Sequence, residues 1–321
     1  NVILLFLLLY YLSWLNPSSP ESGVYSANRR AGQEKEKIKL IIALVASIFF
    51  IVLPNHAEIV VWIAVINDTM MTFFYLLSLL FLLIAGKTGK TRLFFYLGSL
   101  IFFILSLMTK EMAMTLPGIV FLFLAYDCCQ QKLSSAKIIR SLLVFLPYAI
   151  ILGLFLWWRQ QLIGLLLGDY VHRNFVITGE IAWRAYASVF FSNFLSDGAR
   201  ATVTDFFIDR RLVLGWVVIV PALVGILISL KKRVGGLGWL IAGAFLTSIV
   251  PVISFGVNAT PIYFSEEGER YAYLPSVFWV VLVALIFGLF YSFLVKKHQY
   301  FKPGLIVLLT FLLALSAGQL I

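Results

Sequence analysis

The feature that most restricts the fold of this chain is its series of long apolar runs, which are separated by short polar stretches. Hydrophobic residues make up 61% of the 321 residues, and charged residues make up only 12%. An α-helix of about 20 apolar residues spans the hydrocarbon core of a bilayer, whereas a soluble domain of this length is far more polar. The sequence therefore predicts an all-α, polytopic membrane helix bundle.

Ten apolar runs are candidate spans, and several are short, which is typical of tilted or broken helices. They cover about 1–15, 38–54, 69–86, 93–109, 114–127, 140–158, 212–230, 237–254, 274–295 and 304–321. We interpret 1–321 as a single transmembrane domain. Because both ends lie in apolar runs, we expect the sequence to be part of a longer protein.

Most of the 25 basic residues lie in five of the stretches that separate these spans. They are Arg29, Arg30, Lys35, Lys37 and Lys39, then Lys87, Lys90 and Arg92, then Lys132, Lys137 and Arg140, then Lys231, Lys232 and Arg233, and finally Lys296, Lys297 and Lys302. Since these stretches alternate with stretches poor in Lys and Arg, the positive-inside rule predicts that they are cytoplasmic. The net charge of +10 therefore reflects the orientation of the chain in the membrane and does not indicate nucleic-acid binding. We expect this membrane to be a bacterial inner membrane or the endoplasmic reticulum.

Two further local patterns lead to simple interpretations. The run Gly86-Lys-Thr-Gly-Lys-Thr91 looks like a phosphate-binding loop, but that motif needs a glycine where Ile84 stands, so we predict a turn. Cys128 and Cys129 are adjacent, and adjacent cysteines rarely bridge each other, so we predict no disulfide.

Residues suited to chemistry gather on the predicted external side. These candidates are His56, Glu58 and Asp68, then Lys110 and Glu111, and then Glu269, Arg270, Tyr271 and Tyr273, within the polar and aromatic run from Glu266 to Pro275. The segment 159–211 is also external, and its helical apolar spacing predicts an interfacial amphipathic helix that either covers the bundle or contacts substrate. A catalytic site, if the chain has one, is therefore expected outside the cytoplasm.

Several candidates also have a purely structural interpretation, although His56 has none. Asn55 and Glu58 match a variant of the helix capping box. Lys110 could form a local ion pair or extend its ammonium group to the interface. Tyrosines at these positions commonly anchor helices at the membrane surface. A divalent metal near His56, Glu58 and Asp68 is a further option, although that cluster matches no metal motif, and no cofactor is predicted with certainty.

Several of these runs, taken together, resemble one family. Leu53-Pro-Asn-His-Ala-Glu-Ile-Val-Val-Trp62 is similar to its His-Pro-x-His-x-Glu-Ala-Val-x-Trp run, with Leu53 in place of the first histidine. Thr109-Lys-Glu-Met-Ala-Met-Thr-Leu-Pro117 and Glu269-Arg-Tyr-Ala-Tyr-Leu-Pro-Ser276 resemble two more of its motifs, and Ile66-Asn-Asp68 and Tyr126-Asp127 also match. The family is that of the tetratricopeptide-containing transmembrane O-mannosyltransferases and their bacterial relatives, in the GT-C glycosyltransferase superfamily.

The resemblance implies transfer of a sugar from a polyprenyl-phosphate donor to a protein or glycan acceptor outside the cytoplasm. Arg270 and Lys110 would then bind the donor phosphate, and His56, Glu58 or Asp68 would transfer a proton or orient the acceptor. Tyr271 and Tyr273 could pack on the sugar or the prenyl chain, and Glu111 and Glu269 would belong to the same substrate site. The family's catalytic acidic residue and its tetratricopeptide repeats would lie before Asn1 and after Ile321.

Two other functions remain open at this stage. The bundle could be a non-catalytic membrane subunit or scaffold, with its apolar sides against lipids and partner helices. It could also be a transporter of lipid-linked sugars. A transporter is less expected, because the charged residues gather at one face and none is convincingly placed in the middle of a span.

Overall fold

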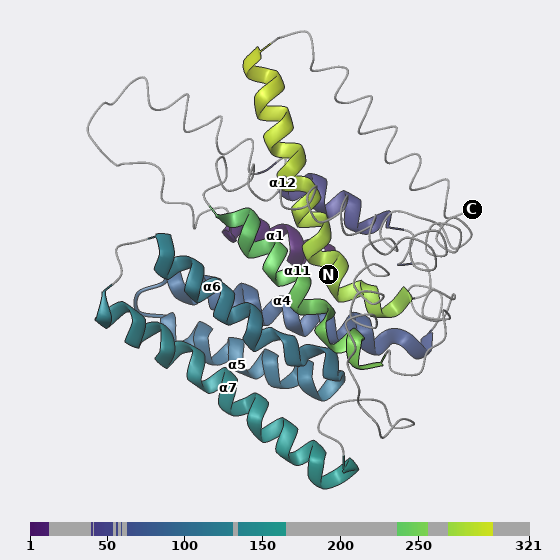
Figure 1. Cartoon of the computed structure of the whole chain (residues 1–321), viewed down its shortest axis with the longest axis vertical. Coiled ribbons are helices and arrows are strands. Elements are labelled where there is room, and N and C mark those ends of the chain that lie inside the picture. Colours follow the sequence, from purple (N-terminus) through teal and green to yellow (C-terminus); the bar gives the residue numbers. More distant parts are fainter. Residues whose placement is uncertain are drawn as a thin grey trace, which may run out of the picture.

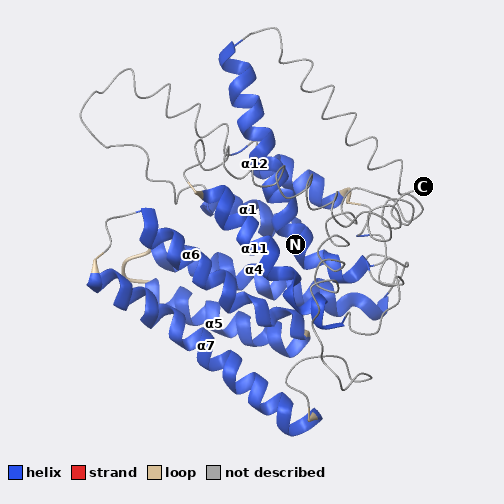
Figure 2. Cartoon of the chain, viewed as in Figure 1, coloured by secondary structure: helices blue, strands red, loops and turns tan. Residues whose placement is uncertain are grey.

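The computed structural model describes residues 1–12, 40, 42–53, 56, 59, 63–130, 134–164, 236–255 and 269–297. Within these ranges, the side chains of residues 12, 64, 130, 252–255, 269–270 and 286–297 are not described. All regular structure in the described part is helical, and no strand occurs in it (Figure 2). The predicted all-α class is thus confirmed for that part of the chain.

The described α-helices coincide with predicted spans. They are α1 (Val2–Leu12), a helix over Ile42–Ile51, α4 (Ile66–Lys87), α5 (Arg92–Thr109), α6 (Leu116–Gln130), α7 (Ser135–Ile163), α11 (Leu237–Phe255) and α12 (Tyr273–Lys297). Three short 3-10 helices, η3 (Ile63–Val65), η4 (Glu111–Thr115) and η6 (Glu269–Ala272), precede α4, α6 and α12. The predicted spans 212–230 and 304–321 lie outside the described residues, so the predicted count of ten helices is not tested.

Four of the described helical stretches are long and apolar enough to cross a membrane. They are Ile66–Lys87, Arg92–Thr109, Glu111–Cys129 and Ser135–Ile163. The last of these, α7, extends beyond its predicted bounds of 140–158, and it stops at Gly164, whose φ of 76° is the left-handed conformation in which glycine commonly ends a helix. Residues 159–163, which we predicted to begin the external segment, therefore continue α7. The rest of that segment, including its predicted amphipathic helix, lies outside the described residues.

The helices pack in layers (Figure 1). Helices α4 and α5 form an antiparallel hairpin around residues 88–91, where a turn and not a phosphate-binding loop was predicted. Helix α7 contacts α5 and α6 and follows one edge of the bundle, whereas α11 contacts both α6 and α12, and α1 contacts α4. The hairpin thus lies between an outer layer that contains α7 and the helices that come from both ends of the sequence.

Small and polar residues hold the helices together, as expected inside a membrane, where apolar surfaces gain little by leaving lipid. A Cβ atom on Gly118 of α6 would lie 2.9 Å from the Cγ2 of Thr247 in α11, so only glycine fits this contact unchanged. The hydroxyls of Ser78 in α4, Ser99 in α5 and Tyr148 in α7 form a buried hydrogen-bonded chain, with 3.2 Å between the serine oxygens and 2.6 Å from Ser99 to Tyr148. These contacts fix how the three helices are placed along one another.

The two ends of the α4–α5 hairpin differ in chemistry. One end carries Lys87 and Arg92 beside the turn, and we call it the Lys87 end. The other carries Asp68 in the first turn of α4 and Lys110 directly after α5, and we call it the Lys110 end. Cys128 and Cys129 are both free thiols, as predicted.

Candidate functional site

An ion pair between Asp68 and Lys110 forms the centre of the Lys110 end. The Nζ of Lys110 donates to both carboxylate oxygens of Asp68, at 2.6 Å and 2.7 Å. The side chains are only 4% exposed for Asp68 and 16% exposed for Lys110, and the two residues come from different helices. Removing one partner of such a pair would leave the other charge in a poorly hydrated place, so each residue depends on the other.

The backbone around Lys110 explains why its side chain faces Asp68. Lys110 is extended, with φ −160° and ψ 142°, and it ends α5 with a hydrogen bond from its N–H to the Ser106 carbonyl. Pro117 cannot bond to the carbonyl four residues earlier, because it lacks an N–H, and it fits best in the first turn of a helix, so a new helix begins next to it. The 3-10 helix η4 bridges the gap, and Pro117 then stands in the first turn of α6.

Two buried hydrogen bonds fasten this break to α4. The Oγ of Ser106 donates to the Met71 carbonyl at 3.0 Å, and the hydroxyls of Tyr75 and Thr115 are 3.0 Å apart. The two contacts connect α4 to Ser106, which precedes Lys110, and to Thr115, which follows it. These hydrogen bonds therefore hold the backbone on both sides of Lys110 against α4.

The motif before α12 reaches the same place. The ring of Tyr271, in η6, lies under the ammonium group of Lys110, with 4.8 Å from Nζ to the ring centroid. An ammonium group over an aromatic face is favourable, and more so where water is scarce. The structure thus brings Asp68, Lys110 and Tyr271 into contact, although they were nominated from three separate stretches of sequence.

His56 lies in a second cluster next to the first. Its Nε2 is 2.9 Å from the Oγ of Ser276, a residue 220 positions away in the sequence. Its ring also packs against Phe50 and Tyr273, with centroid distances of 4.5 Å and 4.7 Å. The Tyr273 hydroxyl accepts a hydrogen bond from the Nδ2 of Asn1, which also donates to the carbonyl of Thr69, beside Asp68. The two clusters are therefore continuous.

The environment of His56 decides its charge. The residue is 6% exposed, and this burial lowers its pKa from 6.5 to about 3, while a hydrogen bond to the Phe50 backbone acts weakly in the opposite direction. His56 is therefore neutral at neutral pH. It can donate or accept a hydrogen bond in that state, but it is a weak base for proton transfer.

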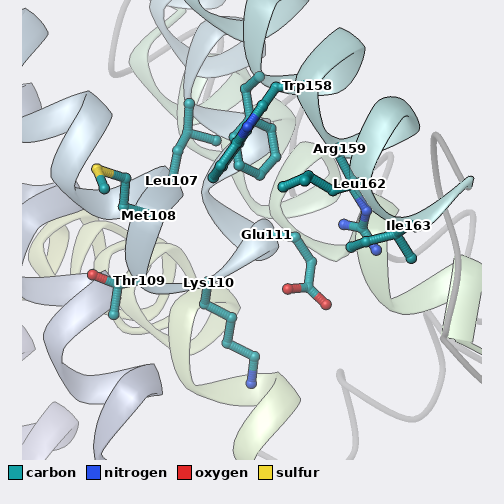
Figure 3. A pocket seen from close by; sticks show the side chains of 10 residues that line it. Leu107, Met108, Thr109, Lys110, Glu111, Trp158, Arg159, Leu162 and Ile163 are labelled. Carbon is teal, nitrogen blue, oxygen red and sulfur yellow. The ribbon is translucent and has the colours of Figure 1, made fainter.

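A cavity of about 290 Å³ lies beside the ion pair, between the ends of α5 and α7 (Figure 3). Its lining comprises Leu107, Met108, Thr109, Lys110, Glu111, Phe155, Trp158, Arg159, Leu162 and Ile163. The stem of Lys110 borders the cavity, but its ammonium group points away from Arg159 (Figure 3). The Glu111 carboxylate forms no ion pair or hydrogen bond with the described residues, so it remains available to a ligand.

The remaining nominated side chains are not described. Glu58 lies outside the described residues, and Glu269 and Arg270 are described as backbone of η6 only. Among the described residues, no three His, Cys, Asp or Glu side chains lie close enough together to hold a metal ion. The interpretation of Asn55 and Glu58 as a capping box also concerns residues outside the described ranges.

Eight of the ten residues that line the cavity were not nominated from the sequence, and Trp158 and Arg159 are among them. Trp158 and Arg159 stand at the predicted end of a span, where a tryptophan and a basic residue commonly mark the membrane surface. A signal was nevertheless present, because Arg159 is among the few basic residues that the alternation places on the external side.

Comparisons with known proteins add no family assignment. No family model, curated protein sequence or solved structure matches this chain.

Proposed function

We propose that this protein is a membrane glycosyltransferase of the GT-C type, which transfers a sugar from a polyprenyl-phosphate donor to an acceptor on the external side. The observation that carries the proposal is the convergence at the Lys110 end. His56, Asp68, Lys110, Tyr271 and Tyr273 come from the stretches that resemble the O-mannosyltransferase motifs, and they form two adjoining clusters.

The convergence also favours a site over mere membrane anchoring. Anchoring tyrosines and lysines face lipid headgroups and water. Here, Lys110 is mostly buried and holds a carboxylate from another helix, and Tyr273 is buried among aromatic rings. The cluster lies at the end of the hairpin opposite Lys87 and Arg92, which the distribution of basic residues predicts to be cytoplasmic.

In the proposed reaction, the bond between the sugar anomeric carbon and the phosphate oxygen breaks, and the electron pair remains on the phosphate. The acceptor hydroxyl forms the new bond and loses its proton. Arg270 would stabilise the phosphate through two parallel hydrogen bonds. Lys110 has three N–H donors and gives two to Asp68, so it can offer at most one to the donor phosphate.

The contacts suggest different roles for the three nominated acid–base residues. Asp68 would position Lys110, because its carboxylate is already held by the ammonium group. His56, which is neutral and enclosed, would support the start of α12 through Ser276. The base that activates the acceptor would then be Glu58 or the acidic residue that the resemblance places before Asn1.

The test measures sugar transfer by the full-length protein in liposomes, with a radiolabelled mannosyl-phosphoryl polyprenol and a peptide that contains serine and threonine. Arg270→Ala should lower transfer by about 100-fold, because it removes the charged contact to the leaving phosphate. Arg270→Lys should restore only part of the activity, because lysine retains the charge without the bidentate geometry.

Arg92→Ala at the Lys87 end is the matched control, and it should leave transfer unchanged. If Arg270→Ala transfers sugar as fast as the unaltered protein at both low and saturating donor, the assignment of the donor site is wrong. If the unaltered protein transfers no sugar from any lipid-linked donor, the non-catalytic subunit becomes the better interpretation.

A further inference from the structure

The cavity at the Lys110 end has two chemically different halves. The charged side chains of Glu111 and Arg159 form what we call the polar half, which Leu162 and Ile163 also border (Figure 3). The other half is apolar and includes Leu107, Phe155 and Trp158. The volume of about 290 Å³ lies just below the range that is usual for sites that bind small molecules.

The polar half offers complementary hydrogen-bonding groups. The guanidinium of Arg159 presents only donors, and the carboxylate of Glu111 presents only acceptors. Arg159 is 5% exposed, and Figure 3 shows both charged groups among the side chains around the cavity. Neighbouring hydroxyl groups suit such a pair, because each hydroxyl can donate to the carboxylate and accept from the guanidinium.

The presence of Glu111 argues against a phosphate in this half of the cavity. A carboxylate beside a bound phosphate would repel it, and in a poorly hydrated site that repulsion is large. Arg159 offers one compensating charge, but the ammonium group of Lys110, which could offer a second, points away from Arg159 and is bound to Asp68 (Figure 3). An uncharged polyhydroxyl group therefore fits the polar half better than an anion does.

The apolar half suggests how a ligand that carries a polyhydroxyl group could reach the cavity. Trp158 is 50% exposed, and Met108 and Leu162 on the rim are also exposed. They lie on α5 and α7, the two spanning helices with the fewest buried residues, so the cavity borders a surface suited to lipid. A ligand with a hydrocarbon chain could then approach along this surface, and the indole of Trp158 could pack against the apolar face of a sugar ring.

We propose that this cavity binds the sugar ring of a lipid-linked sugar, with Glu111 and Arg159 on its hydroxyls and Trp158 against its face. The proposal rests on the proposed function, because such a molecule is the donor in that reaction. It adds a separate sugar site on α5, η4 and α7, with residues that the family resemblance did not assign. The phosphate would lie outside this cavity, toward η6.

The test compares the affinity of the full-length protein for two probes in detergent: citronellyl phosphate that carries a mannosyl group, and citronellyl phosphate alone. The unaltered protein should bind the mannosylated probe at least about tenfold more tightly, since hydrogen bonds to charged groups have effects of that size. Glu111→Gln and Trp158→Ala should each remove most of this preference and leave the affinity for the bare phosphate unchanged.

Trp157→Ala is the matched control, because Trp157 is an exposed neighbour on α7 that does not line the cavity. If both tryptophans only anchored the helix at the membrane surface, the two alanine variants would lose the preference for the mannosylated probe to the same extent. Equal affinity for the two probes, or equal losses in Trp157→Ala and Trp158→Ala, would overturn the sugar site.

The same protein samples are assayed for sugar transfer, so that the two proposals can fail separately. A preference for the mannosylated probe that depends on Trp158, together with no transfer, would support the sugar site and overturn the transferase function. Sugar transfer without a preference for the mannosylated probe would support the transferase function and overturn the sugar site. A Glu111→Gln variant that elutes as an unaltered monodisperse protein but loses the preference excludes misfolding as the cause.

Discussion

Replacing Lys110 with methionine should destabilise the protein strongly, because it removes the ammonium group that donates to both carboxylate oxygens of the buried Asp68. The methionine side chain has nearly the length of the lysine stem, so packing changes little and the charge is the main loss. The Asp68 side chain is 4% exposed, and Lys110 gives both of its oxygens a hydrogen bond. Breaking a buried pair from one side costs roughly 3–5 kcal/mol, and the partial exposure of Lys110 favours the lower value, about 3 kcal/mol.

A double-mutant cycle tests whether this cost comes from the pair itself. Asp68→Asn should cost less, about 1–2 kcal/mol, since the freed ammonium group of Lys110 can turn toward water. The double variant should be more stable than Lys110→Met alone, with a coupling of about 2 kcal/mol, because no buried charge remains. Thermal unfolding in detergent, followed by tryptophan fluorescence, should show a Tm lowered by about 6 °C in Lys110→Met.

Two results would contradict this reasoning. The first is a Lys110→Met variant that melts within about 1 °C of the unaltered protein, which would mean that the buried carboxylate of Asp68 does not depend on Lys110. The second is a double variant whose loss equals the sum of the single losses, because additivity means that the two side chains do not interact.

Three further predictions concern stability at other positions. The pKa of His56 is about 3 in the folded protein and 6.5 in the unfolded chain, so the unfolded chain binds more protons between these two values. The free energy of unfolding should therefore decrease below pH 6.5, by about 2 kcal/mol at pH 5 relative to pH 8. His56→Gln should remove this dependence in unfolding measured at both pH values. Gly118→Ala should lower Tm through overpacking that costs about 1–3 kcal/mol, and Thr247→Ser should rescue it by removing the methyl group that the new Cβ would meet. Tyr148→Phe should cost about 0.5–1.5 kcal/mol in the same assay, because it removes the hydroxyl bound to Ser99.

The sequence was sufficient to predict the helices that the structure describes, because apolar runs of spanning length have few other stable structures in a membrane. The predicted bounds of α5, 93–109, differ from the observed Arg92–Thr109 by one residue. The bounds of α7 were less accurate, since Trp157 and Trp158 look like the end of a span, whereas the helix continues to Gly164. Hydropathy reports where apolar residues stop and not where helical hydrogen bonds stop.

The alternation of basic residues predicted which polar residues share an end of the bundle, and the contacts of His56, Asp68 and Lys110 agree with that grouping. The sequence could not assign partners within the group. Lys110 is adjacent to Glu111, so a local pair was the simple expectation, yet its ammonium group binds Asp68, which is 42 positions away. This pairing across helices depends on the extended backbone of Lys110. The φ and ψ angles of a single residue cannot be predicted from its amino-acid type, so the sequence did not indicate the pairing.

This difference in pairing changes how the two acidic residues should be understood. From sequence, both carboxylates are expected at the same end of the bundle, Asp68 for proton transfer or for orienting the acceptor and Glu111 for the substrate site. In the structure, the charge of Asp68 is balanced by Lys110, whereas Glu111 faces a cavity and has no described partner. A carboxylate that is already bound to a cation is a poor base and a poor ligand for hydroxyl groups, because each new contact must replace an existing one. The two substitutions should therefore separate: Asp68→Asn should act mainly on stability, and Glu111→Gln mainly on the recognition of sugar.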